Sequence, residues 1–344
     1  MDTAPMYNAP AMMMQMITGF WTSCCIHVAA KLGLADLLAE GPMGIDALAE
    51  HTRCDSRSLY RILRALSSVG VFREQEAGQF ENTGLSDTLR TGIPGSMRAM
   101  AITQLGDHLP AWGNLMYSVK TGQTAFDRVE GMTVVDFYDT HPDEGKTFTQ
   151  AMEGLNGLIT GPLLSMVNLG TYDRIVEIGA GRGQLLTSLL PQAPAAHGIV
   201  FDDGAMLDRT VMDIVRKGLS DRCSVLPGNI QEQAPPSADA FVMNMVLHDH
   251  GDGKAGRILM QCAKGMCESS RILAIESVIP EGNMAHPGKF MDINMMAMTG
   301  GQERTEKEFR TLADEAGLEM VRVVPLPYRL LSLIEFRKKK LHAA

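Results

Sequence analysis

Residues 174–186 read RIVEIGAGRGQLL, and this stretch limits the possible folds more than any other part of the chain. A short β-branched run is followed by an acid, Glu177, by the glycines Gly179, Gly181 and Gly183, and by a leucine pattern typical of a helix. A chain that turns tightly off a strand needs residues without a Cβ, both for positive φ angles and for the close approach of a ligand. The stretch therefore predicts a strand, a glycine turn and a helix that together bind a nucleotide.

From residue 173 onward, apolar runs alternate with helix-like segments, which predicts a parallel α/β sheet. The predicted strands are IVEIGA at 175–180, GIVFDD at 198–203, CSVLPGN at 223–229, AFVMNMVL at 240–247 and ILAIESVI at 272–279. Two later runs, LEMVRVVPL at 318–326 and LLSLIEFRK at 330–338, are close enough to form a hairpin at the sheet's edge. Ligands of open α/β sheets bind outside the carboxyl ends of the strands, where the strand order switches.

Polar residues stand at these carboxyl ends. Asp202 and Asp203 end the second strand, Asn229 follows the third, and His248 with Asp249 follows the fourth. An acid about twenty residues beyond such glycines is placed to bind ribose hydroxyls. The order of these residues therefore fits a nucleoside.

The glycine spacing taken alone is equally compatible with NAD. Two details favour S-adenosylmethionine: the glycines follow GxGxG rather than GxGxxG, and Glu177 directly precedes them. A carboxylate is poorly placed beside a pyrophosphate but well placed beside a cationic amino-acid portion. We therefore expect S-adenosylmethionine as the cofactor.

The residues before 170 have a helical pattern, with one or two helices over 11–40. Residues 44–90 follow the order of a winged helix, with two helices and then a two-stranded wing. A DNA-reading surface is visibly basic, whereas residues 41–90 hold six arginines and no lysine against seven acids. We expect this unit to serve packing or dimerisation.

Composition limits the partners and the compartment. A net charge of −9 disfavours nucleic acid and membrane surfaces as partners. No lysine or arginine precedes Lys31, and polar residues interrupt the apolar segment 12–21, so we predict neither a signal peptide nor a membrane span and expect a cytoplasmic protein.

The six cysteines lack a CxxC pair and are expected to be reduced and buried. No metal-ligand spacing is present, so no metal is expected. The 25 methionines are expected to pack the core, with a pocket or subunit interface as the alternative for some.

From about residue 10 to 338 the chain resembles the small-molecule O-methyltransferases of the plant caffeate and bacterial polyketide type. The resemblance rests on four motifs in order: VEIGAGRG at 176–183, FDD at 201–203, SADAFVMNMVLHDHGD at 237–252 and GGQERTEKEF at 300–309. It implies a Rossmann-like methyltransferase domain at 171–344 with a mostly parallel seven-stranded sheet. It also implies a helical region at 1–170, with a winged-helix dimerisation unit at about 36–90, and a homodimer.

The same resemblance implies roles for individual residues. S-adenosylmethionine is expected at Glu177, Gly179, Gly181, Gly183, Asp202, Asn229, Ile230 and Asn244, with the ribose on Asp202 and the adenine beside Asn229 and Ile230. The small-molecule acceptor is expected at Asn294 and Met298. Phe148 and Met152 are four residues apart and can share a helical face, which favours core packing for both, with lining of the acceptor pocket as the alternative.

His248 is implied as the catalytic base. An imidazole with an ordinary pKa near 6.5 can take a hydroxyl proton if its ring is held in one orientation. The family's flanking acids correspond to Glu276 and Glu303, either of which could accept the other ring N–H. For Glu303, the alternative is a surface ion pair with Arg304.

The chain departs from the family's pattern at three positions. It has Asn229 where the family usually has aspartate, Asn244 where it has lysine, and His250 where it has tryptophan. Asn229 can still accept an adenine amino hydrogen. The other two changes alter the rim of the site, and with 6% aromatic residues a flat acceptor has few stacking partners.

The leading hypothesis is a homodimeric methyltransferase that acts on a hydroxyl oxygen with His248 as general base. The principal alternative is S-methylation of a small thioether acid, such as 4-methylthio-2-hydroxybutyrate in dimethylsulfoniopropionate synthesis. A thioether has no proton to lose, so this reaction needs no base. A third hypothesis is a winged-helix regulator that senses S-adenosylmethionine, and the acidic balance argues against it.

Overall fold

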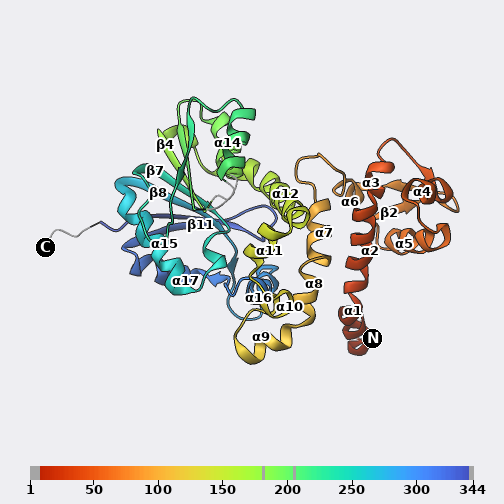
Figure 1. Ribbon diagram of the computed structural model, residues 1–344. Coiled ribbons are helices and arrows are strands. Elements are labelled where there is room, and N and C mark those ends of the chain that lie inside the picture. Colours follow the sequence, from red (N-terminus) through yellow and green to blue (C-terminus); the bar gives the residue numbers. More distant parts are fainter. Residues whose placement is uncertain (1–7, 180–182, 204–206, 341–344) are drawn as a thin grey trace, which may run out of the picture. The chain divides into compact units, whose positions relative to one another are not determined.

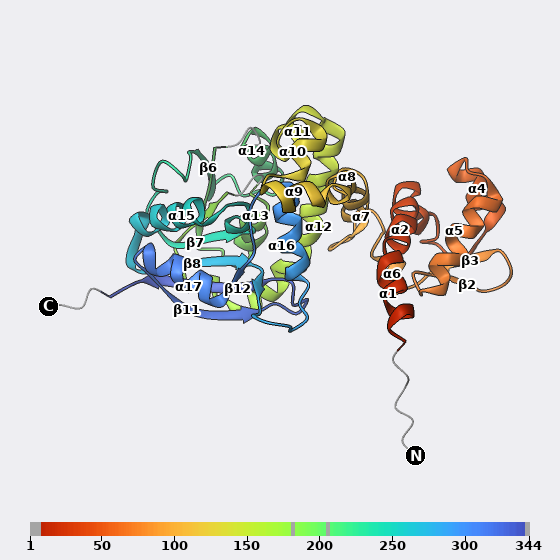
Figure 2. The same ribbon diagram turned by 90° about the horizontal axis from the view of Figure 1, so that it is seen from below.

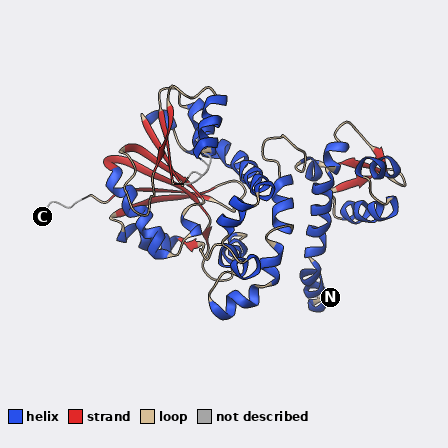
Figure 3. Ribbon diagram, viewed as in Figure 1, coloured by secondary structure: helices blue, strands red, loops and turns tan. Residues whose placement is uncertain are grey.

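The computed structural model describes residues 8–179, 183–203 and 207–340, which form two compact units (Figure 1). The first unit comprises Met1–Leu109 and Tyr138–Gly157, and the second comprises Pro110–Phe137 and Leu158–Ala344. Helices dominate the first unit, and the larger sheet lies in the second (Figure 3).

The first unit contains the predicted winged helix. Its elements up to residue 105 are α1 (Ala9–Thr18), α2 (Phe20–Leu32), α3 (Leu34–Leu37), β1 (Met43–Gly44), α4 (Ile45–Thr52), α5 (Ser56–Ser68), β2 (Phe72–Glu74), β3 (Gln79–Asn82), α6 (Gly84–Asp87) and α7 (Arg98–Leu105). Helix α5 begins after Asp55, whose side chain accepts a hydrogen bond of 2.8 Å from Ser58 N, and it buries Leu59, Leu63 and Leu66. The strands pair antiparallel in the order β1-β3-β2, so the two helices and the wing are present in the predicted order.

Large apolar side chains on α1 and at the start of α2 are exposed. None of the residues of α1 is buried. Met14, Met16, Ile17, Phe20 and Trp21 are 54% to 69% exposed. The expectation that the methionines pack the core is therefore wrong for this segment.

The second unit is built on a sheet with the strand order β11-β12-β8-β7-β4-β5-β6. Its strands are β4 (Arg174–Ile178), β5 (His197–Asp202), β6 (Cys223–Pro227), β7 (Ala238–Asn244), β8 (Met266–Glu276), β11 (Leu318–Pro325) and β12 (Ser332–Lys338). Strands β4 to β8 are parallel, whereas β12 pairs antiparallel with β8 and with β11. The predicted parallel sheet and its edge hairpin are confirmed.

Helices cover both faces of this sheet (Figure 2). The helices of the chain from residue 109 onward are α8 (Leu109–Gly113), α9 (Leu115–Thr121), α10 (Ala125–Glu130), α11 (Val134–Thr140), α12 (Pro142–Met166), α13 (Gln184–Leu189), α14 (Leu207–Arg216), α15 (Asp252–Gly265), α16 (Gly288–Met298) and α17 (Glu306–Glu315). Apolar residues of α15 and α17 pack with Phe241, Ile272 and Phe336 on one face. On the opposite face, α13 lies so close to β5 that a Cβ at Gly198 would stand 3.0 Å from Leu186 Cδ2.

Two predicted strands end earlier than their apolar runs. β7 ends at Asn244, Met245 has a positive φ of 52°, and Leu247–Asp249 forms a 3₁₀ turn. β8 ends at Glu276, and the next short strand β9 (Val278–Ile279) pairs with β10 (Arg304–Thr305). β7 ends early because the amides of Val246 and Leu247 donate to the Glu276 carboxylate instead of continuing the hydrogen-bond ladder with β8.

The strand order switches at β4. From β4 the chain continues outward through β5 and β6, and then crosses to β7 on the other side of β4. The carboxyl ends of β4, β5, β7 and β8 therefore meet at one edge, where open α/β sheets bind ligands.

Two further expectations concern membranes and cysteines. Among the described residues, none of the helices combines the length and the apolarity needed to cross a bilayer. All six cysteines are free; Cys223 and Cys262 are buried, but Cys267 is exposed and the other three are half-buried. The expectation of burial therefore holds for only two of the six.

Candidate active site at the carboxyl edge of the sheet

At two positions of the turn after β4, the backbone conformation and the lack of space require glycine. Gly179 and Gly183 have φ angles of 61° and 62°. A Cβ at Gly179 would lie 3.0 Å from both methyl groups of Val246, and one at Gly183 would lie 2.7 Å from Val200 Cγ2. Side chains are strained there by conformation and by space. Gly181 lies outside the described residues, and ligand binding by the three glycines stays a prediction.

Glu177 is buried at the end of β4, with 3% of its surface exposed. Its Oε2 accepts a hydrogen bond of 3.0 Å from Leu186 N, in the first turn of α13. Burial raises the pKa of Glu177 to about 8, although the bond from Leu186 favours the charged form. The carboxylate therefore satisfies an otherwise unpaired amide of a helix start, and its predicted contact with a ligand stays untested.

The other residues predicted to bind the cofactor follow neighbouring strands. Asp202 is the last residue of β5, and Asn244 is the last residue of β7. Asn229 stands two residues beyond β6, and its Oδ1 accepts a 2.8 Å hydrogen bond from Gln231 N, which leaves one lone pair on that oxygen. Ile230 is half-buried against the core of the sheet. The structure thus brings these side chains to the carboxyl edge with Glu177.

His248 lies in the 3₁₀ turn after β7 and is 6% exposed. Its Nδ1 is 2.9 Å from Glu303 Oε1. A carboxylate only accepts hydrogen bonds, so Nδ1 carries the hydrogen. Nε2 is 3.8 Å from Asp249 Oδ1 and makes no hydrogen bond with a described residue. The basic nitrogen of the neutral ring is therefore Nε2.

Glu276 acts on the backbone before His248 and not on its ring. Oε1 of this fully buried residue accepts hydrogen bonds of 3.0 Å from Val246 N and 2.8 Å from Leu247 N. Its Oε2 has no hydrogen-bond partner among the described residues. Of the two acids that could orient the imidazole, the structure places Glu303 on the ring and Glu276 on the preceding turn.

The charges around the ring favour its protonated form. Burial lowers the pKa of His248, but Asp249, the hydrogen bond to Glu303 and the charge of Glu276 outweigh it and raise the pKa to about 10. Burial also raises the pKa of Glu276 to about 7. A positive charge brought to this edge would oppose these carboxylates and lower the pKa of His248.

The loop that carries Glu303 is fixed to the His248 turn. Glu303 N donates to Asp292 Oδ1 on α16 over 2.9 Å, and Gln302 N donates to the carbonyl of His248 over 2.9 Å. A Cβ at Gly301 would lie 2.0 Å from that carbonyl oxygen, so only glycine fits. The base and its carboxylate therefore have a fixed relative position.

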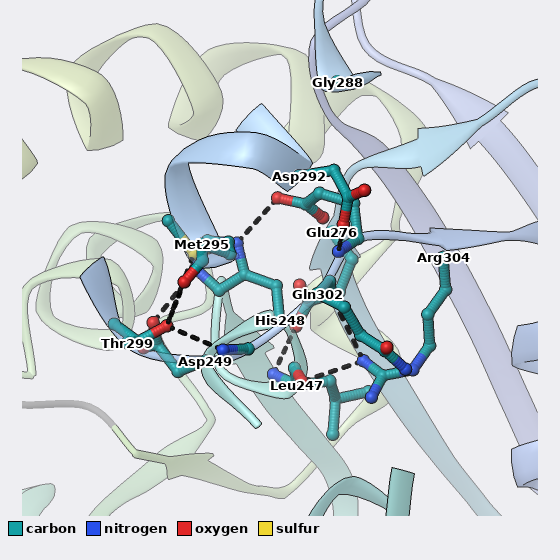
Figure 4. A network of polar contacts seen from close by, with 12 residues as sticks. Leu247, His248, Asp249, Glu276, Gly288, Asp292, Met295, Thr299, Gln302 and Arg304 are labelled. Carbon is teal, nitrogen blue, oxygen red and sulfur yellow. Dashed lines mark hydrogen bonds and ion pairs between the residues drawn. The ribbon is translucent and has the colours of Figure 1, made fainter. Parts of the chain in front are cut away.

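Arg304 is fully buried beside the same turn (Figure 4). Its guanidinium donates to the carbonyl oxygens of Leu247 (2.9 Å), His250 (2.7 Å) and Gln302 (3.3 Å), and to Asp252 Oδ1 (2.9 Å). The alternative of a surface pair between Glu303 and Arg304 is wrong, because both are buried and each has another partner. Arg304 instead holds the backbone on both sides of His248.

The predicted acceptor residues are divided between the two units. In the second unit, Asn294 and Met298 on α16 are 7% and 2% exposed, and Trp112 Nε1 donates to Asn294 Oδ1 over 2.9 Å. Phe148 and Met152 belong to the first unit. There, Phe148 stacks on Tyr138 with ring centroids 4.4 Å apart. Acceptor binding by these residues stays a prediction.

The three residues of the base cluster are also close enough to hold a metal ion. Ligand atoms of His248, Glu276 and Glu303 lie within 4.8 Å of one another. Because Nδ1 of His248 already donates to Glu303, only Nε2 is left on this ring as a metal ligand.

Sequence reasoning missed four residues that shape the site: Trp112, Asp252, Asp292 and Arg304. Two signals were available. A half-buried tryptophan needs an acceptor for its N–H, and Arg304 stands inside the motif GGQERT beside a predicted site acid. For Asp252 and Asp292 the partners lie in distant segments, so the local sequence contains no comparable signal.

Comparison with known proteins identifies relatives along nearly the whole chain. A family model described as the O-methyltransferase domain matches residues 112–319, and one described as the O-methyltransferase dimerisation domain matches residues 14–92. Phenazine O-methyltransferase PhzM of Lysobacter antibioticus is 35% identical over 327 residues, which cover 95% of this chain and 96% of the relative. Mitomycin biosynthesis 6-O-methyltransferase of Streptomyces lavendulae is 32% identical over 94% of this chain and 93% of its own.

A solved structure adds a bound ligand to this comparison. The crystal structure of CalO1, a methyltransferase in calicheamicin biosynthesis, contains S-adenosylhomocysteine, the demethylated form of the cofactor. Its TM-score against this chain is 0.85, at 28% identity over 98% of this chain and 100% of that one.

Proposed function

The chain belongs to the O-methyltransferase family and is an S-adenosylmethionine-dependent methyltransferase of small molecules, and from this premise we propose that it methylates a hydroxyl oxygen with His248 as general base. The observation that carries the proposal is the imidazole whose Nδ1 donates to Glu303 while Nε2 makes no hydrogen bond with a described residue. A ring held in this way presents one basic nitrogen in one direction.

His248, Glu303 and Glu276 have different roles in removing the proton from the acceptor. Bound S-adenosylmethionine would supply the methyl group of its sulfonium to the acceptor oxygen, and S-adenosylhomocysteine would leave as the carbon–sulfur bond breaks. His248 Nε2 takes the hydroxyl proton, Glu303 stabilises the imidazolium through Nδ1–H, and Glu276 holds the turn. Base catalysis of this kind contributes about 10²–10⁴ in rate, and the alignment of the reactants supplies much of the rest.

We place the cofactor at the switch point of the sheet. Asp202 stands at the end of β5, where we expect the ribose, and the remaining lone pair of Asn229 Oδ1 suits an adenine amino group. We assign Gly179, Gly181 and Gly183, together with Ile230 and Asn244, to the rest of the cofactor. Contact with Glu177 is the weakest part of this assignment, because its Oε2 is bonded to α13.

The reaction is expected to give a methyl ether. Purified enzyme with labelled S-adenosylmethionine should methylate members of a panel of phenols and hydroxy acids, and mass spectrometry of the product identifies the methylated atom. Sulfur is not favoured, since the relatives named above methylate oxygen. Label found only on thioether acids would contradict the oxygen assignment.

We also propose a homodimer formed through residues 14–92, which the dimerisation-domain match supports. Phe20 and Trp21 are 54% and 61% exposed, and large apolar surfaces of this kind mark interfaces. Phe20→Asp should weaken dimerisation at least about tenfold, as measured by analytical ultracentrifugation over a concentration series. Val215→Asp, at a 62% exposed apolar position on α14, is the matched control and should not dissociate the dimer. Equal behaviour of the two variants would contradict an interface at Phe20.

We propose that the reaction needs no metal, no nucleic acid and no membrane, and that it takes place in the cytoplasm. The six free cysteines fit a reducing compartment.

A further inference from the structure

Two buried carboxylates beside His248 each keep one oxygen without a hydrogen-bond donor. Glu276 uses Oε1 for the amides of Val246 and Leu247, and Glu303 uses Oε1 for the imidazole. In the part of the chain that the structure describes, Oε2 of each carboxylate has no hydrogen-bond partner. The two residues are 0% and 4% exposed. Burial of an unpaired carboxylate oxygen is costly, and a positively charged ligand removes that cost.

Support of the catalytic turn accounts for only one oxygen of each carboxylate. A neutral acceptor at the position of Glu276 Oε1 would hold the two backbone amides equally well, without a buried negative charge. The buried guanidinium of Arg304 does not pair with either acid, since it donates to three carbonyl oxygens and to Asp252. Both second oxygens therefore remain as ligands for a cation.

The imidazole completes a set of three ligands. Ligand atoms of His248, Glu276 and Glu303 lie within 4.8 Å of one another. The three residues come from the turn after β7, the end of β8 and the loop before β10, and this loop is held by the bond from Glu303 N to Asp292. One imidazole and two carboxylates suit a zinc ion, which takes three protein ligands and leaves a position for water. Ca²⁺ and Mg²⁺ require more oxygen ligands than this cluster offers.

We propose that His248, Glu276 and Glu303 form a binding site for Zn²⁺ or a similar transition-metal ion, with Oε2 of each carboxylate and one ring nitrogen as ligands. The metal takes the place of a proton on the ring, and that proton leaves to solvent. In the tautomer that Glu303 selects, the ligand is Nε2, whose lone pair is then occupied. A metal that replaced the Nδ1 hydrogen would leave a hydrogen on Nε2, with the same effect. Inhibition of methyl transfer follows from the proposed role of His248 as base, whereas the site itself does not depend on that role.

A cobalt titration tests the site without an assay of activity. Chelator-treated protein is titrated with Co²⁺, whose absorption spectrum reports its ligands, and Zn²⁺ is then added as a competitor. One Co²⁺ per chain should bind, with visible d–d bands and without the strong near-ultraviolet band of thiolate ligands, and Zn²⁺ should displace it. A spectrum dominated by the thiolate band would assign the metal to the cysteines and overturn the proposal. Absence of saturable binding would overturn it as well.

Three variants locate the bound ion. Glu276→Gln and Glu303→Gln keep an amide oxygen for the existing hydrogen bonds but replace the free Oε2 with an amide nitrogen, so each should weaken Co²⁺ binding at least about tenfold. Asp249→Asn is the matched control. It removes a carboxylate that lies 3.8 Å from Nε2, is 44% exposed and stands outside the cluster, so it should change the affinity less than about threefold. Equal losses in all three variants would indicate an adventitious ion only and overturn the site.

The kinetic arm separates the site from the proposed function. Zn²⁺ should inhibit methyl transfer by the wild-type enzyme, and a chelator should restore the rate. The Zn²⁺ concentration for half-inhibition of the residual activity should rise in Glu276→Gln in parallel with the lost Co²⁺ affinity, and binding of S-adenosylhomocysteine, measured by calorimetry, reports whether the variant is folded. Metal that binds the cluster without inhibition would contradict His248 as base and leave the site in place. Unchanged metal affinity and inhibition in folded Glu276→Gln would overturn the site.

Discussion

Replacing His248 with alanine is expected to lower kcat by about 10²–10⁴ while the affinity for S-adenosylhomocysteine stays near the wild-type value. The loss follows from the geometry, because Glu303 holds Nδ1 and Nε2 makes no hydrogen bond with a described residue. Single-turnover methyl transfer measures kcat, and calorimetry measures cofactor affinity. Retention of more than about half the rate would exclude a base mechanism at this residue.

A base mechanism also predicts the direction in which the rate changes with pH. Only neutral imidazole accepts a proton, and the surrounding carboxylates raise the pKa of His248 to about 10, so kcat/KM of the free enzyme should rise with pH through the neutral range. Glu303→Gln removes the carboxylate at Nδ1. The pKa of His248 should then fall, and the rising limb should move to lower pH with a lower maximum rate. Glu319→Gln is a matched control, because Glu319 carries an exposed ion pair with Arg337 and should leave the limb in place.

Much of the fold could be predicted from the sequence, because the strands and helices follow local apolar periodicity. The exceptions lie where a distant group takes over the backbone. Glu276 captures the amides of Val246 and Leu247 from 30 and 29 residues away, and the apolar run of β7 contains no sign of it. On α1 the apolar residues are exposed instead of buried. The sequence did not predict this, because apolar character alone does not distinguish a core from an interface.

For the candidate site, the positions of side chains at strand ends were predictable, but their tertiary partners were not. The order of side chains at the strand ends follows from the parallel sheet, so Asp202, Asn229 and His248 could be located before the structure. The resemblance left two acids as possible partners of the His248 ring, and the sequence does not choose between them because Glu303 is 55 residues away. Trp112 and Asn294 are 182 residues apart, and their hydrogen bond depends on tertiary packing that local patterns do not encode.

Arg304→Met is expected to lower the free energy of unfolding by about 2–4 kcal/mol and kcat by about 10². Methionine has a similar reach but no donors, so the carbonyls of Leu247 and His250 lose their bonds to the guanidinium in a buried setting. Asp252 is 66% exposed and can return to water, so its lost ion pair adds little. Denaturant unfolding and methyl-transfer kinetics measure the two effects.

The matched control is Arg310→Met, which removes a guanidinium whose ion pair with Glu306 is 52% exposed on both sides. Its loss should cost less than about 1 kcal/mol and leave kcat unchanged. Arg304→Lys keeps the charge but not the planar fork, so it should recover part of the stability and little of the rate. The contrast is informative because Arg304 touches no reacting atom: it acts through the backbone on both sides of His248. If Arg304→Met is as stable and as active as Arg310→Met, Arg304 does not hold the turn that carries the base.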